Sequence, residues 1–256
     1  MGIPVVTVVS GGMPIVDVGA GKLGLPVTEA TNGRGIAVTK VVGKPGLPVV
    51  FDTIGVLPPV TYATFDPASV AAVTLSGGNL VATNTGTTAN EQGAKSATAK
   101  TNGKYYFEMA FTAYSGSVLR IGVGVGPPAS TYTAVSAGAT TGAVIVANGA
   151  VHANGVGNIV DIIAGSFPVG AVVGIAVDLD NRRGWFRHAP SGLWLASATA
   201  NPATNTEGVT IPAGTMVPYC TFGGTAGVAG NITTVNFGAS PFSGAVPAGF
   251  TSGWPT

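Results

Sequence analysis

The sequence predicts an almost entirely β protein, and its composition is the first reason. Charged residues make up only 8% of the 256 residues, whereas Gly numbers 40 and Pro 18, which favours strands and tight turns over long helices. Hydrophobic residues reach 46%, so the chain has apolar surface to bury, unlike a disordered Gly- and Pro-rich segment. Repeats before residue 58 and period-two alternation after residue 60 are the other reasons. They divide the chain into residues 1–57 and 58–256.

Residues 1–57 repeat a short unit of Gly, a large apolar residue, Pro and a β-branched run. GIPVVTVV begins at Gly2, GMPIVDVG at Gly12, GLPVTEAT at Gly24 and GLPVVFDT at Gly46, with a degenerate copy, GIAVTKVV, from Gly35. Pro cannot donate to a strand ladder, so each unit is a short extended segment that restarts. Such units cannot close a core, and apolar strand edges attract partners. We expect an extended arm that docks onto another subunit; a flexible linker is the alternative. Its candidate contacts are Val5, Val6, Val8, Ile15, Val16, Leu25 and Val27.

Residues 58–256 read as strands joined by tight turns. In KYYFEMAFTAY, period two predicts one core face and one half-exposed face. The core face is Tyr105, Phe107, Met109 and Phe111, and the half-exposed face is Tyr106, Glu108, Ala110 and Thr112. In RIGVGVG, Ile121, Val123 and Val125 share a core face, and the glycines between them indicate the close approach of another backbone or ring. Asn148–Gly149 and Asn154–Gly155 predict hairpin turns.

The segment VVGIAVDLDNRRGWFRH gathers charges in a chain that is otherwise nearly bare of them. Val173, Ile175, Val177 and Leu179 alternate as one apolar face, residues 180–184 form a turn, and WFRH begins the return strand. Asp178 and Asp180 lie two residues apart, as a calcium site or an acid/base pair would have them. Calcium needs more oxygen ligands than two carboxylates, and catalytic pairs usually come from separate strands. We therefore interpret the segment as a turn between strands.

Five stretches follow one another in a recognisable order: GKYYFEM, RIGVGV, VVGIAVDLDNRRGWFRH, MVPYCTF and TVNFG, with FSGAVPAGFTSGW after them. This order resembles SPRY domains, and the preceding ATFDPASVAAVTLSGGNLVATN is similar to the lead-in of bacterial and phage versions. The resemblance covers about residues 62–256. It implies a two-sheet, antiparallel, concanavalin-like β-sandwich that binds partners through loops at one end and is not catalytic. RHAPSGLWL departs from the family, which often has Asn-Gly before its Trp.

Charge and motif content exclude several function classes. The net charge is +1 and no basic run exceeds two residues, so nucleic-acid binding lacks its Lys/Arg field. No run of 18 apolar residues is free of Gly, Pro or charge, so no membrane insertion is expected. A single cysteine, Cys220, expected to be a buried small apolar residue, and two histidines, His152 and His188, leave no metal site. We expect no metal and no cofactor.

Enzyme motifs are missing as well. The sequence has no G-x-S-x-G elbow, H-E-x-x-H, P-loop or paired Cys. Glu108 and Asp178 are the best candidates for paired acids, but both have ordinary structural interpretations on strand faces. The structural alternative for Arg120 is that it pairs with Glu108. We expect no catalytic residue.

The expected function is therefore structural or binding. An uncharged, Gly-rich sandwich with an apolar arm suits a bacteriophage virion protein, present in many copies or as a homo-oligomer and assembled in the host cytoplasm. In this hypothesis the arm docks onto other virion proteins, as a capsid-surface decoration or tail-associated protein, and the sandwich faces outward. The alternatives are a receptor- or glycan-binding fibre tip and a soluble adaptor that recognises a peptide segment of a partner.

Candidate contact residues on the sandwich lie in and after the charged turn. Aromatic residues and Arg are enriched at binding hot spots. We expect contacts with a partner, including a host-surface glycan or protein, at Arg182, Arg183, Trp185, Arg187, His188 and Trp194. The alternative for Trp185 and Trp194 is that they cap the sandwich.

Overall fold

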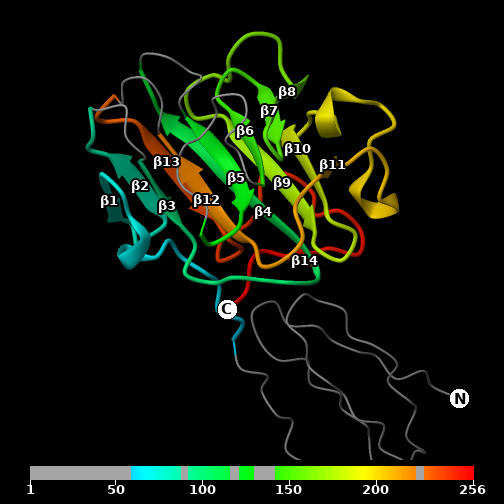
Figure 1. The fold of residues 1–256 in the computed structure, drawn as a ribbon, viewed down its shortest axis with the longest axis horizontal. Helices are drawn as coiled ribbons and strands as arrows, with labels where there is room; N and C mark the ends of the chain where they lie inside the picture. The colour runs from blue at the N-terminus through cyan, green and yellow to red at the C-terminus, as the bar shows by residue number, and fades with distance from the viewer. Residues whose placement is uncertain (1–58, 88–91, 116–120, 130–141, 223–227) are drawn as a thin grey trace, which may run out of the picture. The chain divides into compact units, whose positions relative to one another are not determined.

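The computed structural model describes residues 59–87, 92–115, 121–129, 142–222 and 228–256. Within the compact unit Val60–Thr256, two β-sheets pack face to face (Figure 1). Apart from one short parallel pair, neighbouring strands in the described sheets are antiparallel. The predicted all-β, two-sheet sandwich is confirmed. The repeats before residue 58 and Arg120 lie outside the described residues.

The larger sheet has eight strands. Their order is β1 (Val73–Ser76), β2 (Val81–Asn84), β13 (Ile232–Asn236), β4 (Lys104–Ala113), β9 (Val172–Asp178), β10 (Arg183–His188) and β11 (Val209–Thr210), and β14 (Thr251–Ser252) pairs with β4 in parallel. The charged segment supplies β9, the turn and β10, as predicted.

The smaller sheet has six strands. Their order is β3 (Gly93–Lys95), β12 (Val217–Thr221), β5 (Gly122–Gly126), β6 (Ala143–Val146), β7 (Ala150–Ala153) and β8 (Val156–Asp161). Three 3-10 turns are described outside the sheets: η1 (Pro67–Ser69), η3 (Trp194–Ala196) and η4 (Pro202–Thr204). No helix among the described residues is long and apolar enough to cross a membrane.

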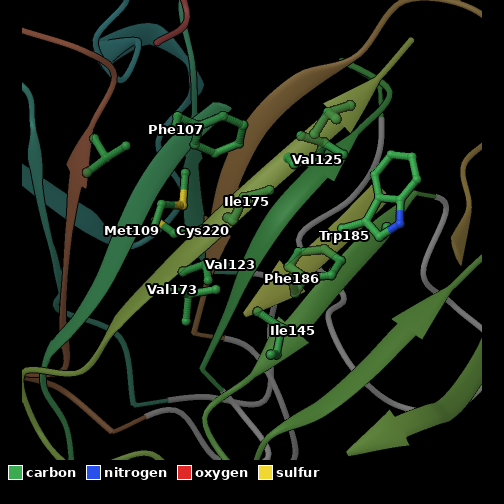
Figure 2. Packing of buried hydrophobic residues seen from close by; sticks show 14 of the residues in the cluster. Phe107, Met109, Val123, Val125, Ile145, Val173, Ile175, Trp185, Phe186 and Cys220 are labelled. Carbon is green, nitrogen blue, oxygen red and sulfur yellow. The ribbon is translucent and has the colours of Figure 1, made fainter. Parts of the chain in front are cut away.

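The core lies between the two sheets and is built mainly from β-branched and aromatic side chains (Figure 2). The fully buried residues labelled there include Phe107, Met109, Val123, Val125, Ile145, Val173, Ile175 and Cys220. Cys220 is a free thiol, and burial raises its pKa to about 12. The prediction that it is a small buried residue is confirmed.

Glycine-containing turns set the strand pairing. Asn154 and Gly155 join β7 to β8 with φ values of 49° and 79°, which a two-residue hairpin turn with two positive φ angles requires. Gly149, before β7, has φ 92°. The glycine face of β5 also behaves as predicted, because a Cβ on Gly124 would lie 2.1 Å from the carbonyl oxygen of Ala143. The backbones of β5 and β6 therefore approach too closely for a side chain there.

The prediction for the two faces of β4 is partly wrong. Phe107, Met109 and Phe111 are buried as expected, but Tyr105 is only half-buried. Tyr106 and Glu108, expected on a half-exposed face, are 0% and 3% exposed. The chain around Phe242 causes this burial, because it covers the outer face of the sheet and the Phe242 ring packs edge-on against Tyr106 at 5.0 Å.

The two lateral edges of the sandwich differ. On one side, isolated backbone bridges join Ala71 to Gly93 and Phe65 to Ser96, linking the chain beside β1 to the β3 region. On the other side, β8 and β11 are the last strands of their sheets (Figure 1). The sandwich is therefore closed by backbone contacts on one side and bordered by two edge strands on the other.

Candidate functional site

The charged turn between β9 and β10 is held by its own carboxylate. The Asp178 side chain has no exposed surface and accepts hydrogen bonds from the backbone N–H of Asp180 (3.0 Å) and of Asn181 (2.9 Å). It also accepts from Asn181 Nδ2 (2.8 Å) and pairs with Lys104 Nζ at 2.9 Å. Burial alone would raise the pKa of Asp178, but the Asn181 hydrogen bonds and Lys104 outweigh it and lower the pKa. The interpretation as a turn between strands fits these contacts.

Asp180 and Arg182, which follow Asp178 in the turn, hydrogen-bond to nearby loops at the same end of the sandwich. Asp180 accepts a hydrogen bond from the backbone N–H of Gly103 at 2.8 Å. The guanidinium of Arg182 donates to the carbonyl oxygens of Gly214 (2.7 Å) and Thr101 (2.9 Å). Arg182 was predicted to contact a partner, and its donors already join two loops to the turn.

A second polar network lies on the outer face of the larger sheet. Glu108 accepts hydrogen bonds from Tyr106 Oη (2.7 Å) and from the backbone N–H of Ser243 (2.9 Å) and Gly244 (2.7 Å). Desolvation, followed by the hydrogen bond to Glu108, raises the pKa of Tyr106. The carboxylate thus fixes the chain after β13 onto β4.

Arg187 and Trp194 form the surface end of this network. The Arg187 guanidinium lies 4.4 Å from the Trp194 ring centroid, a cation–π contact, and Nη2 donates to the carbonyl oxygen of Ala245 at 2.7 Å. Trp194 begins η3, in which Leu195 and Ala196 have φ values of 48° and 55°. Leu193, just before it, is 57% exposed. Arg187 and Trp194 were both predicted as contact residues, and the structure places them, half-buried, against each other.

Trp185 and His188, also predicted as contact residues, lie on β10 but do not join the Arg187–Trp194 pair. Trp185 is fully buried; its ring packs 6.4 Å from Phe250 and its Nε1 donates to the carbonyl oxygen of Thr206 at 2.8 Å. It is therefore a core residue rather than a contact residue in this structure, as the capping alternative had it. His188 is half-buried and packs edge-on against Phe167 at 5.4 Å. The arm residues predicted as contacts lie outside the described residues.

A groove of about 490 Å³ lies at the lateral edge between β8 and β11. Val156 and Ile159 of β8, which are 58% and 45% exposed, form its apolar wall. Leu195 of η3 and Val209 of β11 also line it. Figure 1 shows β8, β10 and β11 on this side of the sandwich, together with the 3-10 turns η3 and η4, which are drawn in yellow. The groove therefore exposes aliphatic surface beside the backbone of an edge strand.

Charged and hydroxyl groups border the apolar wall. The exposed carboxylate of Glu207 accepts hydrogen bonds from Ser197 Oγ (2.6 Å) and Thr199 Oγ1 (2.5 Å), and these lower its pKa. Both oxygens of the ionised Glu207 carboxylate are thus held in place at the rim of the groove. Arg183 lines the groove as well, and its Nη1 donates to the carbonyl oxygen of Gly208 (2.8 Å) and to Thr210 Oγ1 (3.1 Å).

Of the two charged residues that line the groove, one was predicted from the sequence, and the exposed aliphatic residues were not. Arg183 was predicted, whereas Val156, Ile159 and Glu207 were not. The signal for β8 was VGNIVD after the Asn-Gly turn, a short strand with exposed aliphatic residues. Glu207 carried no signal, because its hydroxyl partners come from the loop after η3.

The described side chains offer no evident metal centre, since no group of three or more His, Cys, Asp or Glu among them is placed to hold an ion. The lining of the groove mixes aliphatic, hydroxyl and charged groups. This combination fits the recognition of a polypeptide segment, in which apolar side chains alternate with polar backbone.

No family model matches the sequence, and no curated protein matches it either. Solved structures do share the fold. The SPRY domain of human HERC1 superposes with a TM-score of 0.50 at 14% identity, covering 67% of this chain and 96% of that one. The PSpry domain of TRIM65 gives 0.45 at 15% identity, over 68% and 92%, and stonustoxin gives 0.43 at 17%, over 68% and 27%. At these identities the likeness shows the fold alone, and that fold is the SPRY-type, concanavalin-like β-sandwich.

Proposed function

We propose that this chain is a non-catalytic, protein-binding β-sandwich that recognises a partner at the groove between β8 and β11. The groove carries the proposal, because it places exposed aliphatic side chains, a fixed carboxylate and an edge strand in one place. The buried carboxylates support the non-catalytic part. Asp178 and Glu108 are 0% and 3% exposed and saturated with internal donors, so neither reaches a substrate.

The finer proposal is a bacteriophage virion component, with residues 1–57 attached to the particle and the sandwich facing outward. It rests on the sequence: an uncharged, Gly-rich chain with Pro-restarted β-branched repeats. A soluble adaptor has no need of such an arm. Arm-deleted protein should fail to bind particles that lack the native copy, and the arm fused to an unrelated domain should bind them. Equal binding with and without the arm contradicts this proposal.

Site-specific photo-crosslinking tests the groove. A benzoylphenylalanine replaces Ile159 in the full chain, and the matched control carries it at Val169, an exposed residue outside the groove. We expect adducts with a protein from the Ile159 position in the native assembly, and their loss when Val156→Asp is added. Equal adducts from both positions, or none from Ile159, contradict groove-mediated recognition.

A further inference from the structure

Strand β8 is an edge strand, and one of its two sides is open to pairing with a further strand. It pairs with β7 on one side and is the last strand of its sheet, and no described strand pairs with its other side. Exposed edge strands usually carry charges or bulges that discourage pairing. Here Asn158 has φ 48°, but Val156 and Ile159 still expose aliphatic side chains along the strand. An added strand would cover them.

The surface beside this edge has acidic groups. Glu207 is exposed and ionised, with its oxygens fixed by Ser197 and Thr199. Asp161, at the end of β8, is exposed as well. Arg183 is the positive group of the groove, and its Nη1 already bonds to Gly208 and Thr210. A cation from a partner can therefore pair with Glu207. A Lys or Arg side chain on an otherwise aliphatic strand fits this position.

One repeat unit of residues 1–57 combines a Lys with an aliphatic, β-branched run. Units beginning at Gly12, Gly24 and Gly46 carry Asp17, Glu29 and Asp52, and the unit at Gly2 is uncharged in GIPVVTVV. The copy from Gly35, GIAVTKVV, instead places Lys40 inside a β-branched run and has no Pro within it. Each of its residues therefore keeps an N–H for a strand ladder.

We propose that residues 36–42 of a second copy of the chain add as a strand to the open edge of β8, with Lys40 beside Glu207. The inference rests on the proposed role of residues 1–57 as a docking arm, and it assigns this one unit of the arm to the groove of another copy, while the other repeat units serve the attachment to the particle. Ile36, Val38 and Val42, which alternate along the segment, are the side chains that would cover Val156 and Ile159. Reciprocal exchange of the two arms makes a symmetric dimer.

Charge reversal in the full chain tests this contact by sedimentation equilibrium. Lys40→Glu alone places Glu opposite Glu207, and Glu207→Lys alone places Lys opposite Lys40. Each variant should weaken self-association by about tenfold relative to wild type. An equimolar mixture of the two should restore it, because each arm then meets a groove of opposite charge. Restoration in the mixture is the decisive result, since damage to folding in either variant does not produce it.

Two aliphatic variants test the strand addition. Val156→Asp should reduce self-association at least about tenfold, because it places a charge in the covered wall. Val169→Asp, at a valine that is 60% exposed compared with 58% for Val156, is the matched control and should change nothing. A wild-type chain that stays monomeric, or a mixture no tighter than either charge variant alone, overturns the inference. Crosslinks from Ile159 to a different protein also overturn it, while they support recognition at the groove.

Discussion

Replacing Glu108 with Ala should detach the chain that covers the outer face of the larger sheet. The carboxylate is 3% exposed and accepts from Tyr106 Oη, Ser243 N and Gly244 N. The tyrosine hydroxyl can rotate towards another acceptor, but the two backbone N–H groups cannot. Gly244 is buried whereas Ser243 is exposed, so one buried donor loses its acceptor. An unsatisfied buried donor costs about 1–3 kcal/mol, and the unfolding free energy should fall by about that amount. This is a large part of the roughly 5–15 kcal/mol typical of a domain.

Urea denaturation followed by tryptophan fluorescence measures that loss. Glu108→Gln should fall between wild type and Ala, because it keeps one acceptor oxygen but turns an N–H₂ towards a backbone donor. Asp66→Asn is the control: Asp66 caps η1 through the N–H of Ala68 at 2.9 Å, and Asn caps as well as Asp, so stability should change by less than about 0.5 kcal/mol. A loss below about 1 kcal/mol for Glu108→Ala would refute the argument that these bonds hold the segment.

Three further predictions concern folding. Asp178→Ala should lower the unfolding free energy by about 1–3 kcal/mol, because it leaves the partly exposed Lys104 and the turn donors without their acceptor; an unchanged melting temperature contradicts this. His152 is buried with neither ring nitrogen hydrogen-bonded, and burial lowers its pKa, so the unfolded chain binds more protons: stability is full above about pH 6.5 and falls below it. His152→Leu should flatten melting temperature against pH between about 5 and 6.5, and an identical slope in both proteins contradicts this. A chain starting at Val60 should fold alone with a cooperative melt, because Thr61 and Ala63 pair with Thr256 and Trp254; an insoluble product contradicts this.

Alternation in the sequence predicts the inner faces of the sandwich because both sides of that core are built from strands. Val173, Ile175 and Val177 on β9 and Val123 and Val125 on β5 are buried as predicted. Their environment follows from period two and from the sheets facing each other. The turn of residues 180–184 was likewise predictable, since its carboxylate bonds are local.

The outer face could not be predicted in the same way. Tyr106 and Glu108 follow an alternation that is typical of a half-exposed face, yet Ser243 and Gly244, about half the chain away, cover them. Trp185 was misassigned for the same reason, because Phe250 and the chain at Thr206 bury its ring. Burial of an outer face depends on long loops whose paths carry no periodic signal.

The same limit applies to the groove, which combines β8, β11 and the loop after η3. Its carboxylate nevertheless differs from the buried carboxylates of the sandwich. Asp178 and Glu108 use their carboxylates for internal donors, and Arg182 and Arg187 use guanidinium donors for backbone carbonyls.

Glu207 differs because its carboxylate is exposed and its oxygens are held by side-chain hydroxyls rather than by a buried turn. A fixed, ionised and solvent-accessible carboxylate loses little freedom when a cation approaches, so pairing there costs less than at a mobile surface acid. Next to it, Val156 and Ile159 supply aliphatic area that is worth roughly 25 cal/mol for each Å² buried. In the proposed recognition at the β8–β11 edge, a bound segment would therefore gain from both groups at once.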